Sequence, residues 1–174
     1  MALIFRPAVY EDIGFFFYLS QCPEIRALSG NPTNPSWPEH LAWWDQQLPR
    51  SLFYVAEQEN GHPVGVIRFE PDRASQDLHR SSTVERLFQA WMPDDEKQSH
   101  YLWVSVAIAT RFQGNGYGTW LIQQTSRLAA FEYRQPIIAE IYQDNRASIA
   151  AFQKAGYFWC GVENGLHRFQ YANR

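Results

Sequence analysis

A glycine-rich loop at residues 113–118 is the segment whose composition points most directly to chemistry. Its sequence, Gln-Gly-Asn-Gly-Tyr-Gly, lies between an apolar, β-rich run and an amphipathic stretch with helical periodicity. Glycine adopts positive φ angles and permits close approach to the backbone, so successive N–H groups of such a loop can converge on one anion. The positive end of a following helix strengthens this attraction. We therefore predict a pyrophosphate site here, with a simple tight turn as the alternative.

Two common phosphate-binding patterns do not fit this loop. A dinucleotide-binding fingerprint spaces its glycines as G-x-G-x-x-G near an N-terminal strand, whereas the spacing here is G-x-G-x-G. A nucleoside triphosphate loop requires Gly-Lys followed by Ser or Thr, and this sequence does not occur in the loop. The surrounding sequence must therefore decide between a binding site and a turn.

Two segments of the chain together resemble a known family. Residues 108–122, IATRFQGNGYGTWLI, resemble the acetyl-CoA-binding segment of the GNAT superfamily of N-acetyltransferases, whose loop runs Gln/Arg-x-x-Gly-x-Gly/Ala. Residues 145–157, NRASIAAFQKAGY, resemble a later motif of that superfamily, in which an Asn opens a helix that ends in a Gly-aromatic pair. The order of elements is also similar over most of the chain, except at residues 71–99. The resemblance implies transfer of an acetyl group from acetyl-CoA to a primary amine, by direct attack in a ternary complex.

The same resemblance implies how the cosubstrate is held. The main chain of Val106 and Ile108 is expected to pair with the pantetheine arm as if the arm were an additional strand. The amides of residues 114–119 are expected to bind the pyrophosphate, and Asn145 to hydrogen-bond the arm from the opposite side. The expected acetyl-CoA site comprises Val106, Ile108, Gln113, Gly114, Asn115, Gly116, Tyr117, Gly118, Thr119, Asn145 and Phe152.

The catalytic groups depart from the family pattern. Members often protonate the departing thiolate with a Tyr in the second motif, and the matching residue is Phe152, which has no proton to donate. Solvent can suffice, because a thiol with a pKa near ~8.5 leaves with modest help. Candidate general bases are Glu70, His79 and Ser105, each equally compatible with a solvated or structural role. The missing Tyr also motivates a different hypothesis, a non-catalytic acyl-CoA-binding module.

A narrower resemblance concerns the acceptor. Residues 24–69 are similar to acetyltransferases that act on nucleotide-activated amino sugars, and the matching positions are Arg26, His40, Trp43 and Arg68. Trp can stack on a sugar or base, and Arg pairs with phosphate. The same residues could instead be core packing and surface charge. Acetylation of a protein N-terminus, a polyamine or an antibiotic amine is the alternative.

The elements expected around these motifs form one α+β domain over residues 1–174. Its central sheet is expected to be mixed, mostly antiparallel and flanked by helices, with a long connection or insertion at about 71–99. Tight turns are expected at Asn60-Gly61 and Asn164-Gly165, and the spacing of Ser36 and Glu39 predicts a capping box at a helix start. The strands are expected at 2–9, 52–58, 64–70, 101–109, 137–142, 157–162 and 166–172, and the helices at 11–22, 36–48, 119–133 and 145–155.

Composition excludes several classes of protein. The chain has 174 residues and a formal net charge of -3, which leaves no basic stripe for a nucleic acid. It has no apolar run of the ~18 to 20 residues that would span a bilayer, and its start does not fit a signal peptide. Its 2 cysteines provide neither a disulfide framework nor a metal-ligand pair. We expect a cytoplasmic enzyme without a metal or membrane partner, monomeric or homodimeric, whose partner is a small-molecule amine.

Overall fold

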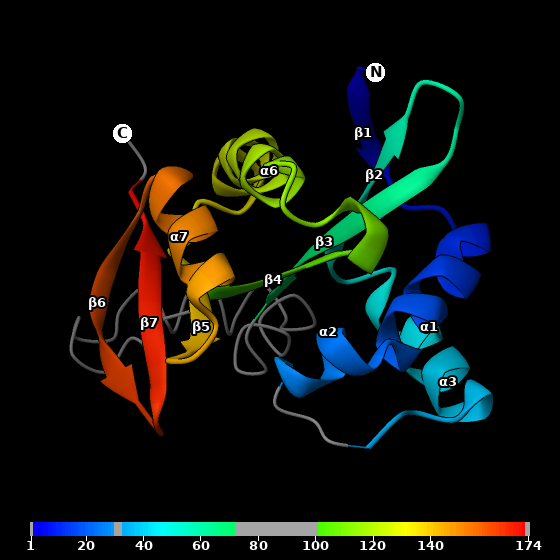
Figure 1. Cartoon of the computed structure of the whole chain (residues 1–174), viewed down its shortest axis with the longest axis horizontal. Coiled ribbons are helices and arrows are strands. Elements are labelled where there is room, and N and C mark those ends of the chain that lie inside the picture. Colours follow the sequence, from blue (N-terminus) through cyan, green and yellow to red (C-terminus); the bar gives the residue numbers. More distant parts are fainter. Residues whose placement is uncertain (1, 30–32, 72–100, 173–174) are drawn as a thin grey trace, which may run out of the picture.

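The computed structural model describes residues 2–29, 33–71 and 101–172. Within these residues, seven strands form one sheet in the order β1-β2-β3-β4-β5-β7-β6, and every neighbouring pair is antiparallel except β4 with β5 (Figure 1). The predicted α+β domain with a mostly antiparallel mixed sheet is confirmed. The strands are β1 (Leu3–Pro7), β2 (Leu52–Gln58), β3 (Pro63–Pro71), β4 (Leu102–Ile108), β5 (Ile137–Tyr142), β6 (Tyr157–Glu163) and β7 (Leu166–Tyr171).

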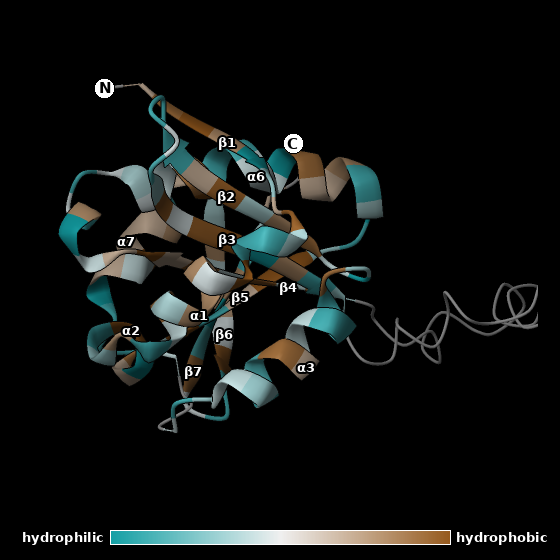
Figure 2. Ribbon diagram, turned by 90° about the vertical axis from the view of Figure 1, so that its right-hand side faces the viewer, coloured by the Kyte–Doolittle hydropathy of each residue, from teal (hydrophilic) through white to brown (hydrophobic). Residues whose placement is uncertain are grey.

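Helices cover both faces of the sheet. Alternate residues of β2 enter different clusters: Phe53 and Val55 pack with one set of helices, and Tyr54 and Ala56 with the other. Because successive side chains of a strand point to opposite faces, the two sets lie on opposite sides. Hydrophobic residues accordingly concentrate in the central strands (Figure 2). The first set is α1 (Ile13–Gln21), α2 (Pro23–Ala27) and α3 (Trp37–Gln47), and the second is α6 (Tyr117–Tyr133) and α7 (Arg146–Lys154).

Local sequence signals account for several element boundaries. The backbone N–H and the hydroxyl of Ser36 both donate to the Glu39 carboxylate at 2.7 Å, as predicted for the start of α3. At the β6–β7 turn both Asn164 and Gly165 have positive φ. At the β2–β3 turn only Gly61 does, so the prediction of a paired left-handed turn there is half wrong.

The short helix α2 was not predicted. Pro23 was expected to end the preceding helix, but it also occupies the first turn of the next one. Proline is tolerated there because the first N–H groups of a helix have no intrahelical acceptor. The structure also begins α6 at Tyr117, two residues before the predicted start. Most of the predicted insertion at about 71–99 lies outside the described residues and stays a prediction.

The sheet is divided between β4 and β5. These strands pair only through Leu102 with Ile137 and Trp103 with Ile138. By contrast, β4 pairs with β3 along its whole length, as far as Ile108 with Gly65. In Figure 1, β4 runs between the group β1–β3 and the group β5–β7. From Val104 onward, the edge of β4 that faces β5 therefore has no neighbouring strand.

Candidate active site

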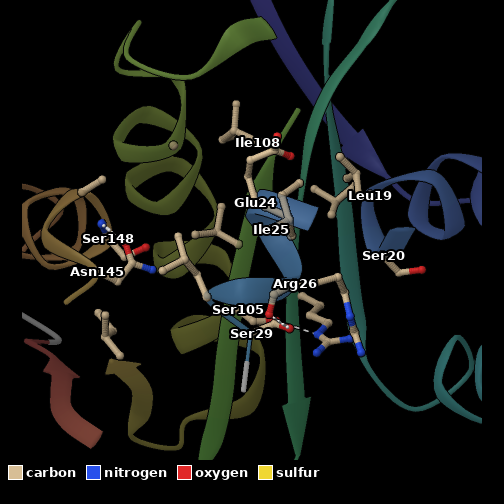
Figure 3. A pocket seen from close by; sticks show the side chains of 18 of the residues that line it. Leu19, Ser20, Glu24, Ile25, Arg26, Ser29, Ser105, Ile108, Asn145 and Ser148 are labelled. Carbon is tan, nitrogen blue, oxygen red and sulfur yellow. Dashed lines mark hydrogen bonds between the residues drawn. The ribbon is translucent and has the colours of Figure 1, made fainter. Parts of the chain in front are cut away.

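One cavity of about 1200 Å³ connects the glycine loop with α2 and α3. It follows β4, with β5 and α7 on the other side, so it occupies the place where β4 and β5 separate (Figure 3). Of the predicted site residues, it is lined by Arg26, His40, Trp43, Arg68, Ser105, Val106, Ile108, Gln113, Gly114, Gly116, Tyr117, Gly118, Thr119, Asn145 and Phe152. Glu70 and Asn115 are not among the lining residues. His79 lies outside the described residues.

The glycine loop presents backbone donors to the cavity. Gly114 and Gly116 have φ of +78 and +77, and a Cβ added to either would meet no atom within 4 Å. Conformation therefore requires glycine here, and the open space beside it is available to a ligand. Asn115 braces the loop by donating to the carbonyls of Phe112 and Gln113, each at 3.1 Å.

The start of α6 adds further donors. The N–H of Trp120 bonds back to the carbonyl of Gly116, which is the N-cap. The N–H groups of residues 117–119 precede this bond and therefore have no intrahelical acceptor. Oriented N–H groups and the positive end of a 17-residue helix form an anion-binding arrangement.

The free edge of β4 offers hydrogen bonds to an extended ligand. The N–H of Ala109 donates to the carbonyl of Val64 on the β3 side at 2.9 Å. Because backbone groups alternate along an antiparallel strand, Val106 and Ile108 direct theirs away from β3 and toward the cleft. The Gln113 side chain already occupies the Ile108 carbonyl, at 2.9 Å. An extended amide chain fits the groups that remain.

Helix α7 forms the opposite wall. The Asn145 Oδ1 caps the helix by accepting from the Ser148 N–H at 3.1 Å, which leaves the Asn145 amide nitrogen as a donor. Figure 3 shows both side chains at the pocket. Phe152 is 3% exposed and packs edge-on against Tyr157, with ring centroids 4.9 Å apart. The Tyr157 hydroxyl pairs with Ser126 at 2.7 Å, and burial raises the pKa of Tyr157, so this tyrosine is a structural residue.

Arg68 makes three contacts at the end of the cavity near α2 and α3. Its Nε donates to the Ser105 Oγ at 2.5 Å and lies 3.2 Å from the Glu70 Oε2. Its Cζ lies 5.2 Å from the centroid of the Trp43 ring. Ser105 accepts a hydrogen bond from a cation, and Glu70 is an ion-pair partner outside the cavity lining. Ser105 and Glu70 thus contact the same guanidinium nitrogen, and their roles as general bases stay predictions.

His40 is buried beneath the same part of the cavity. It is 3% exposed and packs against Phe17 and Trp43, with centroids 5.2 and 5.3 Å away. Burial lowers the pKa of His40, a hydrogen bond with the Ile13 backbone opposes this, and the charge of Arg68 lowers the pKa further. Its Nε2 has no hydrogen-bond partner among the described residues. The lowered pKa favours the neutral form of the His40 imidazole, which packs against the Trp43 ring.

Arg26 brings a second positive charge to the same end of the cavity. One of its terminal nitrogens donates to the Thr33 carbonyl, while its buried Nε has no hydrogen-bond partner in the part of the chain that the structure describes. Two carboxylates that line the cavity are engaged elsewhere, Glu39 with Ser36 and Glu140 with Arg168. A third, Glu24, is exposed.

Within the described ranges, no group of three His, Cys, Asp or Glu could hold a metal ion, and no helix could cross a membrane.

Comparison with known sequences identifies the family. The model of the acetyltransferase (GNAT) family matches residues 18–157, which include the glycine loop, β4 and α7. The chain belongs to this family. It is therefore an N-acetyltransferase with acetyl-CoA as its cosubstrate, and the hypothesis of a non-catalytic binding module is set aside. The donors of the loop, of the β4 edge and of Asn145 suit the phosphates and amides of this cosubstrate.

Relatives of this GNAT domain differ in their named substrates. A putative phosphinothricin acetyltransferase, YwnH, from Bacillus subtilis (strain 168) is 25% identical over 135 residues, 77% of this chain and 71% of the relative. AAC(6')-Ib, solved with paromomycin and acetyl-CoA, has a TM-score of 0.71 at 14% identity and covers 99% of this chain and 94% of its own. Spermidine N-acetyltransferase from Vibrio cholerae, solved with CoA and spermine, has a TM-score of 0.69 at 13% identity, covering 97% and 92%. At this identity the two structures show the fold alone.

Sequence reasoning missed several residues of the cavity. Glu24 and Ser29 belong to the segment around the unpredicted α2, and Tyr142 ends β5. Ser148 had a usable signal, because it lies four residues before Phe152 and so one helical turn away on the same face of α7. The others had no local signal.

Proposed function

We propose that this enzyme acetylates a small primary amine whose molecule also carries an anionic group. The observation that supports this is a pair of cavity-lining arginines on the acceptor side. Arg68 contacts Trp43 and Ser105, and the buried Nε of Arg26 has no hydrogen-bond partner among the residues that the structure describes. Arg binds phosphate, phosphinate and carboxylate groups through its planar fork of donors. Amino-sugar nucleotides and phosphinothricin both combine such a group with a primary amine.

We infer that the two substrates bind end to end in the cavity. Acetyl-CoA supplies an activated acyl carbon and a thiol leaving group. Loop amides and the start of α6 bind its pyrophosphate, and Val106, Ile108 and Asn145 bind the amides of its arm. Because the loop follows the C-terminal end of β4, the reactive end of the arm lies back along the strand, toward Val104. The acceptor then enters from α2 and α3, with Arg26 and Arg68 on its anionic group.

A cationic acceptor is the second candidate. Glu24 lines the cavity as an exposed carboxylate and could attract an aminoglycoside, a polyamine or a peptide N-terminus. The two arginines repel a polycation, however, and they lie on the same acceptor side. We therefore expect such amines to be poorer substrates than anionic ones.

An acceptor panel tests the proposal. Release of the CoA thiol would be followed with UDP-glucosamine, phosphinothricin, kanamycin, spermidine and an alanyl peptide. We expect the two anionic amines to have the highest kcat/KM. Removing a charged hydrogen bond costs about 1.5–3 kcal/mol, so Arg26→Gln and Arg68→Gln should lower kcat/KM for these acceptors by about 10- to 100-fold.

A matched control is available on α6. Arg127 is exposed and does not line the cavity, so Arg127→Gln removes the same charge without an effect on the acceptor site. It should leave kcat/KM unchanged. A higher kcat/KM for kanamycin or spermidine, increased further by Arg26→Gln, would refute the anionic acceptor and favour the second candidate.

A further inference from the structure

Ser105 lies where the reactive end of the cosubstrate is expected. It comes two residues after the last β4–β5 pair, at Trp103, and its exposed side chain lines the cavity. Ile108, which adjoins the glycine-loop end of the cavity, is three residues farther along β4, or about 10 Å at ~3.3 Å per residue. An acyl carrier anchored at the loop and extended along β4 therefore brings its thioester close to Ser105.

The contact with Arg68 fixes the direction of the Ser105 hydroxyl. A guanidinium donates and never accepts, so the 2.5 Å contact places the Arg68 Nε–H on an Oγ lone pair. The serine proton must then point elsewhere, and no described protein group accepts it. The second lone pair also stays open to the cavity. A bond from a cation polarises the hydroxyl and makes it a stronger donor.

Glu70 and Trp43 hold Arg68 in this position. The Glu70 carboxylate lies 3.2 Å from the same Nε, and the Trp43 ring lies under the guanidinium carbon. The carboxylate, the guanidinium and the hydroxyl thus form one chain, from the edge of the cavity lining to the cavity itself. Its only member with a proton to exchange with substrates is the serine.

We propose that Ser105 relays a proton from the attacking amine to the leaving sulfur, and that Arg68 positions it. This rests on the proposed acetyl transfer. The amine nitrogen bonds to the acyl carbon, and the C–S bond breaks with its electron pair on sulfur. The nitrogen gives one proton to the open lone pair of Ser105, whose own proton passes to sulfur. Ser105 ends as a hydroxyl, and the products are an amide and a thiol. Ser105 thus protonates the departing thiolate, which Phe152 cannot do.

Substitutions at position 105 test the relay. A positioned acid or base contributes 10²- to 10⁴-fold, so Ser105→Ala should lower kcat by about 100-fold or more with the best acceptor of the panel. The Kd for acetyl-CoA, measured by calorimetry, should not change. Ser105→Thr keeps the hydroxyl in an open position and should restore kcat to within about tenfold of wild type. Ser51→Ala, immediately before β2 and outside the cavity lining, removes the same hydroxyl as a control and should leave kcat unchanged.

Two further measurements separate a relay from a structural role. The solvent deuterium isotope effect on kcat should be large for wild type and Ser105→Thr, and smaller for Ser105→Ala. Arg68→Gln should lower kcat strongly in wild type but little in the Ser105→Ala background, because Arg68 acts on kcat through the hydroxyl.

The outcomes distinguish this inference from the proposed function. A wild-type enzyme that binds acetyl-CoA and acetylates an acceptor, together with a Ser105→Ala variant that keeps kcat within about twofold, overturns the relay alone. Additive losses in the double variant also overturn it, since Arg68 would then act independently. A well-folded wild type that binds no acetyl-CoA overturns the proposed function, and the relay with it.

Discussion

Gly65 allows the sharpest test of the packing behind the active site. It is buried on β3, between Ala56 of β2 and Ile108 of β4. A Cβ at this position would lie 2.4 Å from Ile108 Cδ1 and 2.7 Å from the Ala107 carbonyl oxygen, whereas ordinary contact begins at 3.4 Å. The flexible end of Ile108 can move by itself, but the Ala107 carbonyl oxygen can move only with the backbone of β4. Gly65→Ala must therefore push β4 away from β3.

The magnitude follows from two opposing effects. Overpacking costs about 1–3 kcal/mol, and the loss of unfolded-state freedom on changing Gly to Ala returns about 0.4–1 kcal/mol. A net loss of about 1–2 kcal/mol lowers the Tm by about 2–8 °C in a domain of this size. Because the displaced segment includes Ile108, affinity for acetyl-CoA should fall as well. Urea unfolding, thermal melts and calorimetric titration measure these changes.

Gly14 provides the same substitution without the contact. It lies in the first turn of α1, and a Cβ there would meet no atom within 4 Å. Gly14→Ala should therefore leave stability unchanged or raise it by up to about 1 kcal/mol, and leave acetyl-CoA affinity unchanged. Equal stability of wild type and Gly65→Ala would refute the close approach of β3 and β4 on which this reasoning depends.

Two other predictions concern α7 and α3. Asn145→Ala removes the cap of α7 and should cost about 1 kcal/mol of stability, together with affinity for acetyl-CoA, whereas Asn145→Asp keeps the cap and should lose the affinity alone. Equal affinity in all three proteins would remove Asn145 from the site. Since burial lowers the pKa of His40 below 6.5, the proton favours the unfolded chain, and stability should fall as the pH drops from about 7.5 through 6.5 to about 5.5. His40→Gln should lose less stability over this interval in urea unfolding, and equal losses would contradict the burial of a neutral imidazole.

Local signals in the sequence predicted much of the fold. The capping box of Ser36, the Asn164-Gly165 turn and the strand at residues 137–142 each depend on neighbouring residues, and the structure has all three. Helix α2 was not predicted, because Pro23 both ends one helix and begins another, and the sequence alone does not distinguish these roles.

The site was predictable only as far as its contacts are local. The glycine loop and the Asn145 cap are each formed within a few residues, so their types and spacing suffice to indicate them. Arg68 and Ser105 are 37 residues apart and meet only because β3 and β4 pair in one register. A slip of one residue would turn Ser105 to the other face of the sheet. Ser105 and Glu70 were candidates from the sequence, but their shared contact with Arg68 became visible only in three dimensions.

The short pairing between β4 and β5 has a consequence for the stiffness of the sheet. Among the described residues, two residue pairs are the strand pairing that joins the two halves of the sheet; α6 contacts β2, β3 and β4, α7 contacts β5 and β6, and the two helices contact each other. An extended ligand bound between β4 and β5 would hydrogen-bond to the free edge of β4 and so connect the two halves of the sheet. Stiffness would then depend on occupancy, with the empty enzyme able to flex about Leu102 and Trp103. Substitutions at this hinge would alter affinity without touching any substrate.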